Sequence, residues 1–361
     1  MRFGMVTVFL ACAFSVVARA AELGASGALL TLEVAGVRTE GTALDWSQSE
    51  VIFLARDGRL LTFHPGEAKN YRKLGSRFRG YTSSELRSAM ARDLGKEFEI
   101  SATGHYLVAH PPGQSGQWSQ RFEDLYRSCA HYFSVRGFRL AEPQFPLVAV
   151  VYRNQDEFLR QARAEGAKID SSVLGYYSPM TNRISMFDIG GGKSNRQDWK
   201  MNAETIIHEA THQTAYNTGI HRRFGASPRW VVEGLGTLFE APGVYDSRAN
   251  PSQPARVNRG RFQDFQSLAA GREPGALAQL VTDDRLFQTQ PSRAYAEAWA
   301  LTYWLVETRP QLYAKYLQTM AARPIFVEYT PEQRLEDFTK VFGTNLKLLE
   351  SQFLQYMAKV R

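Results

Sequence analysis

The chain has 361 residues, of which 44% are hydrophobic and 22% are charged. This length and apolar content are sufficient for one large domain and one small domain, each with its own core. The formal net charge is +7, but the 43 lysines and arginines are scattered and never form a run of five. Scattered basic residues are typical of a solvated surface, and no recognisable nucleic-acid-binding motif is present, so nucleic acid is not an expected partner.

Residues 1–20 are typical of a cleavable signal peptide. Arg2 gives a positive start, residues 5–17 form a brief apolar run, and Ala18-Arg19-Ala20 is a small-x-small cleavage site. The apolar run is too short to act as a stable membrane anchor. Cys12 follows a poor lipobox, which disfavours a lipoprotein. We therefore predict an exported chain, periplasmic or secreted, that has no stable membrane anchor and a net charge of about +5.

Cleavage of this signal would leave Cys129 as the only thiol. One cysteine cannot form an internal disulfide, so an exported protein of this kind must take its stability from its core. Cys129 lies near Leu125, Tyr126, Ala130 and Phe133, a spacing that indicates the apolar face of a helix. We interpret Cys129 as a small buried apolar residue and not as a catalytic thiol.

Residues 27–75 have the pattern of a small all-β module. Strands are predicted at residues 30–35, 51–55 and 59–63. Arg56-Asp57-Gly58 predicts a tight hairpin between the last two strands, and Trp46 and Phe53 are candidates for the core. The module carries no set of side chains that suggests chemistry, so we expect it to serve packing or tethering.

Residues 82–361 alternate between helical and strand patterns and then become helical, which predicts an α+β domain. Helices are predicted at residues 83–94, 117–135 and 155–164, and strands at residues 98–101, 105–109, 146–152, 173–177 and 183–187. A further helix is predicted at residues 199–218, with Asp198 as its N-cap and Gly219 as its left-handed end. The remaining helices are predicted at residues 263–270, 276–280, 295–307, 311–320, 331–342 and 346–359.

The predicted helix at residues 199–218 contains His208-Glu209-Ala-Thr-His212, the HExxH pattern. Two histidines four residues apart project from one face of a helix, so both imidazoles can meet one metal ion. Glu209 stands beside that ion and can take a proton from a metal-bound water. Glu233 in the next predicted helix would complete a set of three protein ligands and leave a fourth position for water, as in a catalytic zinc site.

A surface helix with two solvated histidines is the alternative, because such a pattern arises by chance with a probability on the order of one in a hundred. The flanking residues argue against this alternative. Ile206 and Ile207 give the first helix a buried face. Glu233 stands among large apolar residues, where a carboxylate needs a partner, and a metal ion would supply one.

The joint pattern of His208-Glu209-Ala-Thr-His212 and Trp230-Val-Val-Glu233-Gly-Leu-Gly236 resembles the gluzincin metallopeptidases of the peptidase MA clan. The second motif is similar to that of aminopeptidase N-like enzymes. From about His105 to the C terminus, the chain also resembles an uncharacterised bacterial family of gluzincin-like domains. That likeness includes the segment Tyr295-Ala-Glu-Ala-Trp-Ala-Leu301.

This resemblance implies a zincin-like fold in residues 82–361, in which a small mixed sheet, a metal-binding helix and a helical half enclose a cleft. In that fold the strand before the metal helix, here residues 183–187, would border the cleft. An extended peptide could then add to this strand through backbone hydrogen bonds. A peptide or protein is therefore the expected substrate.

Carried over residue by residue, the resemblance implies His208, His212 and Glu233 as Zn²⁺ ligands and Glu209 as the general base. It also suggests Tyr295 as a catalytic residue, whose phenol would donate to the oxyanion that forms on the attacked carbonyl. The alternative for Tyr295 is a core aromatic residue on a helix that is rich in aromatic side chains.

The chain departs from the gluzincin pattern beside the second motif. Gly236 stands where many relatives carry alanine, and Thr237 where some carry an aspartate that orients a ligand histidine. Glu204 and Glu240 are candidates for that orienting role. His221 lies between the two motifs without the glycine spacing of a third histidine ligand, so we expect it at the surface or on the substrate side.

The sequence thus favours an exported zinc-dependent metallopeptidase that hydrolyses peptide bonds with metal-activated water and a glutamate base. Two alternatives stay open. One is a non-catalytic envelope protein that keeps the fold for binding or scaffolding, and the other is a zinc hydrolase of a non-peptide amide. The sequence gives no indication of the oligomeric state.

Overall fold

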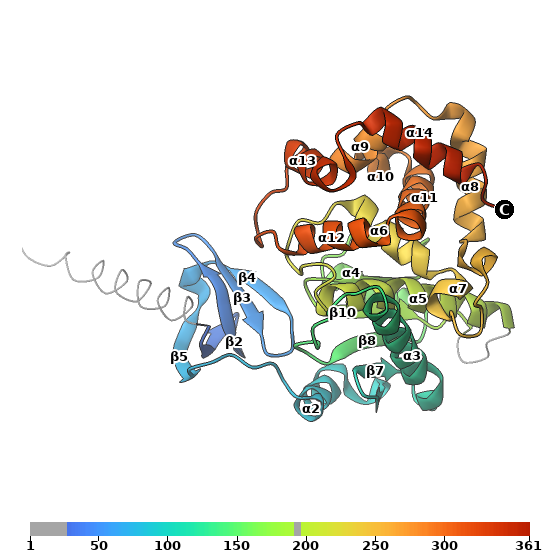
Figure 1. Ribbon diagram of the computed structural model, residues 1–361. Coiled ribbons are helices and arrows are strands. Elements are labelled where there is room, and N and C mark those ends of the chain that lie inside the picture. Colours follow the sequence, from blue (N-terminus) through green and yellow to red (C-terminus); the bar gives the residue numbers. More distant parts are fainter. Residues whose placement is uncertain (1–26, 191–195) are drawn as a thin grey trace, which may run out of the picture. The chain divides into compact units, whose positions relative to one another are not determined.

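The computed structural model describes residues 27–190 and 196–361, and the predicted signal peptide lies outside them (Figure 1). These residues form a mixed α+β protein with an all-β region near the N terminus and a helical C-terminal half. They divide into two compact units. The first holds residues 27–93, 144–146 and 180–182, and the second holds the rest. Within the described residues, no helix is long and apolar enough to cross a membrane.

The first unit is built on a five-stranded antiparallel sheet in the order β4-β3-β2-β1-β5. Its strands are β1 (Leu29–Val34), β2 (Val37–Trp46), β3 (Val51–Ala55), β4 (Leu60–Phe63) and β5 (Lys69–Gly75). The hairpin predicted at Arg56-Asp57-Gly58 is confirmed, since Gly58 has a φ of +88° and donates its N–H to Ala55 O at 3.0 Å. Phe53 is fully buried and Trp46 packs against the same core, as predicted.

Strands β2 and β5 were not predicted. Almost every residue of β5 is exposed, so the strand lacks the alternation of buried and exposed positions that identifies a strand. In β2, Gly41 sits so close to β3 that a Cβ there would overlap Leu54 O. A glycine in a strand normally weakens a strand prediction, and here it allows close approach of the neighbouring backbone. Helix α2 (Ser83–Leu94) follows this sheet and ends where predicted, at Gly95 with a φ of +70°.

The second unit begins with a mixed sheet in the order β6-β7-β8-β10-β9. Its strands are β6 (Glu99–Ala102), β7 (Tyr106–His110), β8 (Leu147–Tyr152), β9 (Gly175–Ser178) and β10 (Arg183–Phe187). Strand β8 runs parallel to β7 and β10, while the outer pairs β6–β7 and β9–β10 are antiparallel. All five strands were predicted from the sequence, although their order in the sheet was not.

Helices cover both faces of this sheet. Apolar side chains of α3 (Ser115–Ser134) and α5 (Arg196–Asn217) share one core with β7, β8 and β10, in which Trp118, Phe122 and Ile206 are buried. On the other face lies α4 (Gln155–Ala164), whose buried Phe158 contacts the rings of Tyr152 and Phe187. Helix α5, which carries the two histidines, is therefore fixed against a buried sheet.

The two ends of α5 can be compared with the ends predicted from the sequence. The helix begins at Arg196, so Asp198 lies inside its first turn, and the prediction of Asp198 as N-cap is wrong. The predicted end is confirmed, because Gly219 follows the helix with a φ of +84°. The buried environment predicted for Cys129 is also confirmed: it is a free thiol in the core of the helical half.

The helical half gathers around α11 (Figure 1). Most residues of α11 are buried. The helices of this half are α6 (Arg229–Phe239), α7 (Pro242–Tyr245), α8 (Arg259–Leu268), α9 (Ala276–Thr282), α10 (Arg285–Thr289), α11 (Pro291–Thr308), α12 (Pro310–Ala321), α13 (Pro331–Phe342) and α14 (Leu346–Met357). The short helices α7 and α10 were not predicted. Gly234 brings α6 close to α11, since a Cβ there would overlap Thr302 and lie 2.6 Å from Ala298 O.

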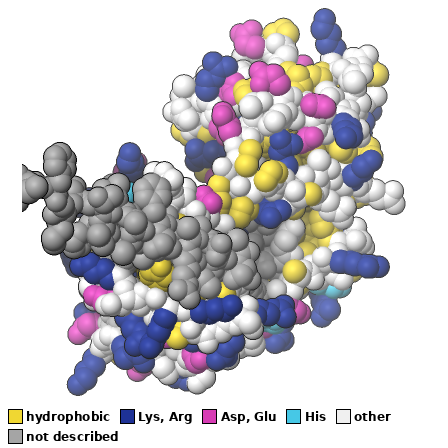
Figure 2. Space-filling view, turned by 90° about the vertical axis from the view of Figure 1, so that its left-hand side faces the viewer, with side chains coloured by type: hydrophobic (Ala, Val, Ile, Leu, Met, Phe, Trp, Pro, Cys, Tyr) yellow, Lys and Arg dark blue, Asp and Glu magenta, His cyan; other side chains and the backbone are white. Residues whose placement is uncertain are grey.

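Charged side chains are distributed over the surface. On the face shown in Figure 2, lysine and arginine side chains are spread widely, with acidic side chains between them. This distribution matches the scattered charge of the sequence.

Candidate metal centre

Helices α5 and α6 pack against each other and bring three predicted metal ligands together. His208 and His212 project from α5, and Glu233 projects from α6; each offers one ligand atom, and these atoms lie within 4.8 Å of one another. The His208 and His212 Nε2 atoms are 3.0 Å apart. Glu233 Oε2 lies 3.4 Å from the first and 3.6 Å from the second.

These three distances fit a metal ion. In tetrahedral coordination with bonds of about 2.1 Å, neighbouring ligand atoms stand about 3.4 Å apart. Glu233 Oε2 is buried and makes no hydrogen bond of normal geometry. A buried carboxylate oxygen without a partner is unfavourable by a few kcal/mol, and a cation at this point would remove that penalty. The residues can therefore hold a metal ion, and imidazole with carboxylate is a donor set for divalent transition metals.

The electrostatics of the group also favour a positive charge at its centre. Burial alone would raise the pKa of Glu233, but the close imidazoles of His208 and His212 outweigh burial and hold this pKa well below its usual range. Burial alone would lower the pKa of His208, yet interactions with Glu233 and Glu240 raise it well above its ordinary value. The carboxylates thus stabilise whatever cation occupies this point, whether a proton on His208 or a metal ion.

Glu240 is the carboxylate that orients His208. Its Oε1 lies 2.8 Å from His208 Nδ1, and its Oε2 accepts a hydrogen bond of 2.7 Å from Asn258 Nδ2. An Nδ1–H that donates to a carboxylate leaves the Nε2 lone pair directed at the metal position. Of the two candidates from the sequence, Glu204 instead lies exposed on the wall of the adjacent cavity. Thr237, where some gluzincins carry an aspartate, turns its hydroxyl back to Glu233 O of its own helix.

Gly236, on α6, leaves room for the imidazole rings of His208 and His212, which project from α5. A Cβ at this position would lie 2.8 Å from His208 Cε1 and 3.0 Å from His212 Cε1. Contacts this short do not occur between a Cβ and a ring carbon, so any larger residue would displace the rings. The departure from alanine noted in the sequence therefore has a steric reason in this chain.

Glu209 lies beside the ligand group without belonging to it. Its Oε2 accepts the backbone N–H of Tyr177, on strand β9, at 2.7 Å. Burial raises the pKa of its carboxyl group above the ordinary value. The side chain lines the same cavity as His208. Glu209 is thus fixed by the sheet at the edge of the candidate metal position.

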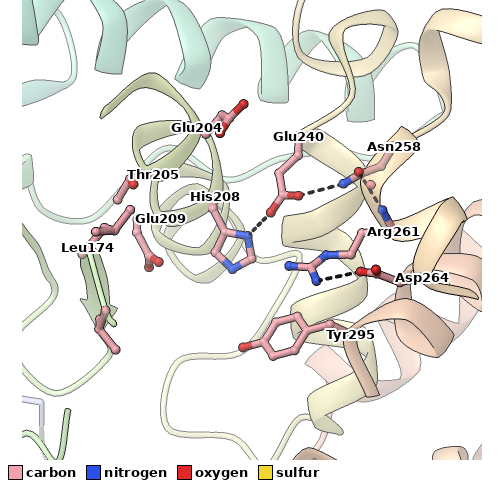
Figure 3. Close-up of a pocket in the computed structure, with 13 residues that line it drawn as sticks. Leu174, Glu204, Thr205, His208, Glu209, Glu240, Asn258, Arg261, Asp264 and Tyr295 are labelled. Carbon is pink, nitrogen blue, oxygen red and sulfur yellow. Dashed lines mark hydrogen bonds and ion pairs between the residues drawn. The ribbon is translucent and has the colours of Figure 1, made fainter. Parts of the chain in front are cut away.

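The cavity in front of this group has a volume of about 570 Å³ (Figure 3). One wall comes from α5 and the segment before β9, and the other from α8 and α11. Its lining residues include Leu174, Gly175, Glu204, Thr205, His208, Glu209, Glu240, Asn258, Arg261, Asp264 and Tyr295. The phenol oxygen of Tyr295 points into this space. Burial raises the pKa of Tyr295 to about 12, with a contribution from the charge of nearby Glu233.

Two expectations about the surroundings are wrong. Strand β10 (residues 183–187) does not border the cleft, because it lies between β8 and β9 in the sheet; β9 forms the edge, and its Gly175 lines the cavity. His221 is not at the surface, since its side chain is buried beside Tyr216. Burial lowers the pKa of its imidazole to about 3. His221 is not a member of the ligand group found among the described residues.

Two residues that contribute to the site were not predicted from the sequence. The Tyr177 backbone N–H cannot be identified from a motif, because every residue except proline carries such a group. Asn258 could have been noticed as a helix N-cap before Arg259-Gly-Arg-Phe, but its contact with Glu240 depends on how α8 packs.

A model of a family described as a protein of unknown function (DUF1570) matches residues 202–326. This segment includes the three candidate ligand residues as well as Glu209, Glu240, Asn258 and Tyr295. No curated protein matches the chain.

Proposed function

We propose that the chain is an exported zinc-dependent metallopeptidase of the gluzincin type, with a zincin-like domain at residues 82–361. The observation that carries the proposal is the convergence of His208 Nε2, His212 Nε2 and Glu233 Oε2 beside a cavity that Glu209 also lines. Two imidazoles and one carboxylate, with water from the cavity as a fourth ligand, would form the ligand set of a catalytic zinc site and not of a closed structural one.

The surroundings of the ligand group support peptide hydrolysis as the reaction. When bound, zinc would polarise the substrate carbonyl and raise the acidity of a water molecule. Glu209 is held by Tyr177 N–H, and its raised pKa suits a base that takes a proton and then passes it to the leaving amine. Tyr295, protonated at neutral pH because its pKa is about 12, would donate to the oxyanion that develops on the attacked carbonyl.

Strand β9 supports a peptide as substrate. Tyr177 turns its N–H toward Glu209 and away from β10. Because alternate residues of an antiparallel strand present their backbone groups to the same side, Gly175 turns its N–H and C=O outward as well, along the cavity that it lines. An extended peptide could pair with these groups across the candidate metal position.

The test compares the wild-type chain with Glu209→Gln on a peptide library, with and without a chelator. We expect chelator-sensitive cleavage by the wild type and none by Glu209→Gln, while both bind zinc equally. Cleavage by Glu209→Gln, or cleavage that survives metal removal, would contradict the proposal. Metal binding without hydrolysis of any amide would instead indicate a binding or scaffold protein, and cleavage of non-peptide amides alone would identify a different hydrolase.

Export and domain division are part of the same proposal. Residues 1–20 would be removed as a signal peptide, residues 27–75 would form a separate β module, and the product would lie in the periplasm or outside the cell. Mass spectrometry of the processed protein after cell fractionation tests this point. We expect a mature N terminus at Ala21.

A further inference from the structure

Asn258 is the N-cap of α8, and its side-chain amide makes three hydrogen bonds. Its Oδ1 accepts the N–H of Arg261 at 3.2 Å, which is the capping contact. Its Nδ2 donates to Thr237 O at 2.9 Å and to Glu240 Oε2 at 2.7 Å. An amide nitrogen carries two hydrogens, so both are used, and each one is directed at α6 or at the residue that ends it.

The Glu240 carboxylate is in an unfavourable position, and the hydrogen bond from Asn258 stabilises it there. Glu240 is the C-cap of α6, where the partial negative charge of the helix end disfavours a carboxylate. Its side chain is 22% exposed, so solvent is available to it in other orientations. Contacts at both oxygens, His208 Nδ1 on one and Asn258 Nδ2 on the other, fix the plane of the carboxylate (Figure 3).

The backbone before Asn258 is itself anchored. Arg256 forms a bidentate ion pair with Glu307 of α11, with distances of 3.0 and 2.8 Å. Val257 is buried in the core of the helical half. The Asn258 amide therefore projects from a fixed segment and can impose an orientation on Glu240.

We propose that Asn258 is a positioning residue for the metal ligand His208 and that it acts through Glu240. Asn258 holds the Glu240 carboxylate, the carboxylate holds the His208 Nδ1–H, and the Nε2 lone pair of His208 is thereby aimed at the metal position. Removing such an outer partner typically weakens metal affinity by about 10- to 100-fold. The proposal rests on the metal site alone and does not require peptide hydrolysis.

Capping of α8 is the competing explanation for this asparagine, and Asn258→Asp separates the two roles. Aspartate caps a helix as well as asparagine does, so the contact with Arg261 N–H is retained. The donor to Glu240 is lost, and a second carboxylate faces Glu240. Asn345→Asp is the matched control, because Asn345 Oδ1 caps α14 through Leu348 N–H at 3.0 Å.

The measurement is the dissociation constant for zinc of the metal-stripped full chain, by competition with a chromophoric chelator. We expect Asn258→Asp to bind zinc about 10- to 100-fold more weakly, and Asn345→Asp to bind it like the wild type. Adding Glu240→Gln to Asn258→Asp should recover most of the lost affinity. The new amide at position 240 could then donate to the new carboxylate at position 258 and still accept from His208.

Three results would overturn the proposal: equal affinity of Asn258→Asp and the wild type, an equal loss in Asn345→Asp, or no recovery in the double variant. A wild-type chain that binds no divalent metal would overturn it together with the proposed function. Tight zinc binding with the expected losses, but without any hydrolysis, would leave the positioning role intact and refute only the proposed peptidase.

Discussion

Each of the two compact units contains a cluster of charged side chains, and the clusters differ in whether they are complete. In the first unit, Arg56 donates to Glu40 and to Glu85, both at 3.0 Å, and to the backbone carbonyl of Arg79 at 3.3 Å. Tyr81 packs over the same guanidinium. Every branch of that guanidinium thus meets an acceptor, and the cluster needs nothing from outside the protein.

The cluster on α5 and α6 has the geometry of a group that can hold a metal ion. His208, His212 and Glu233 direct three ligand atoms at one point, and Glu233 Oε2 is buried without a normal hydrogen bond. Buried polar groups are almost always satisfied, and a cation bound at the point where these ligand atoms converge would satisfy Glu233 Oε2. The two clusters therefore differ in whether each buried carboxylate oxygen has a hydrogen-bond donor. This difference distinguishes a structural charge network from a candidate binding site.

The largest predicted effect is that of Glu233→Ala on metal binding. This change removes one of three ligands and the negative charge that offsets the ion, so we expect the chain to lose stoichiometric metal on dialysis. Metal content by mass spectrometry measures the loss, and circular dichroism controls for folding. A folded variant that still retains one metal ion per chain would refute the ligand role of Glu233.

Arg56→Ala should lower the stability of the fold and leave metal binding unchanged. Two carboxylates would lose their shared cation, and we expect the free energy of unfolding to fall by about 2 kcal/mol. Denaturant unfolding of the metal-free chain measures this change. Zinc affinity should equal that of the wild type, and a change in zinc affinity would show that the two clusters are not independent.

Gly236→Ala should weaken the metal centre without removing a ligand. The added methyl group would lie 2.8 Å from His208 Cε1, and Glu240 prevents that ring from turning freely. We expect zinc affinity to fall by about tenfold. Gly260→Ala is the matched control, because its Cβ would meet only Asn258 Oδ1, at 3.7 Å, along the same cavity. Equal affinities of the two variants would show that the rings have room to move.

A smaller effect concerns acid stability and a second complete cluster, at Glu123. Burial alone would raise the pKa of Glu123, but hydrogen bonds from His105, Thr103 and Arg127 lower it to about 2, against an ordinary value of 4.5. The ionised group therefore stabilises the fold above pH 4.5, and this contribution is lost as the pH falls through about 2. Unfolding free energies between pH 5 and pH 2 should decline less steeply in Glu123→Gln than in the wild type, and parallel profiles would contradict this assignment.

Local patterns in the sequence were sufficient to predict most elements and the metal motif. Helix α4 has clear periodicity and is followed by Gly166, which has a φ of +77°. Strand β8 is a short run of valines and other apolar residues, and the four-residue spacing of His208 and His212 places both rings on one face of α5. Strands β2 and β5 could not be recognised, because their residues are largely polar and their stability comes from pairing with β1 and β3.

The other incorrect or incomplete predictions concern contacts between segments that are distant in the sequence. A hairpin pattern shows that β9 and β10 pair, but it does not determine which of them pairs with β8. The sequence offered two candidates, Glu204 and Glu240, for the carboxylate that orients a ligand histidine. Only the packing of α6 against α5 shows that Glu240 is the one in contact with His208. The role of Asn258 depends in the same way on where α8 begins relative to α6, which no local pattern encodes.

The most direct test of the metal centre is X-ray absorption at the zinc edge on purified full-length chain loaded with one equivalent of zinc. We expect two imidazole nitrogens and one or two oxygens at about 2.0–2.2 Å. In His208→Ala, the imidazole contribution should fall to that of a single ring. A zinc site with no imidazole scattering, or a spectrum that is unchanged by His208→Ala, would contradict the account.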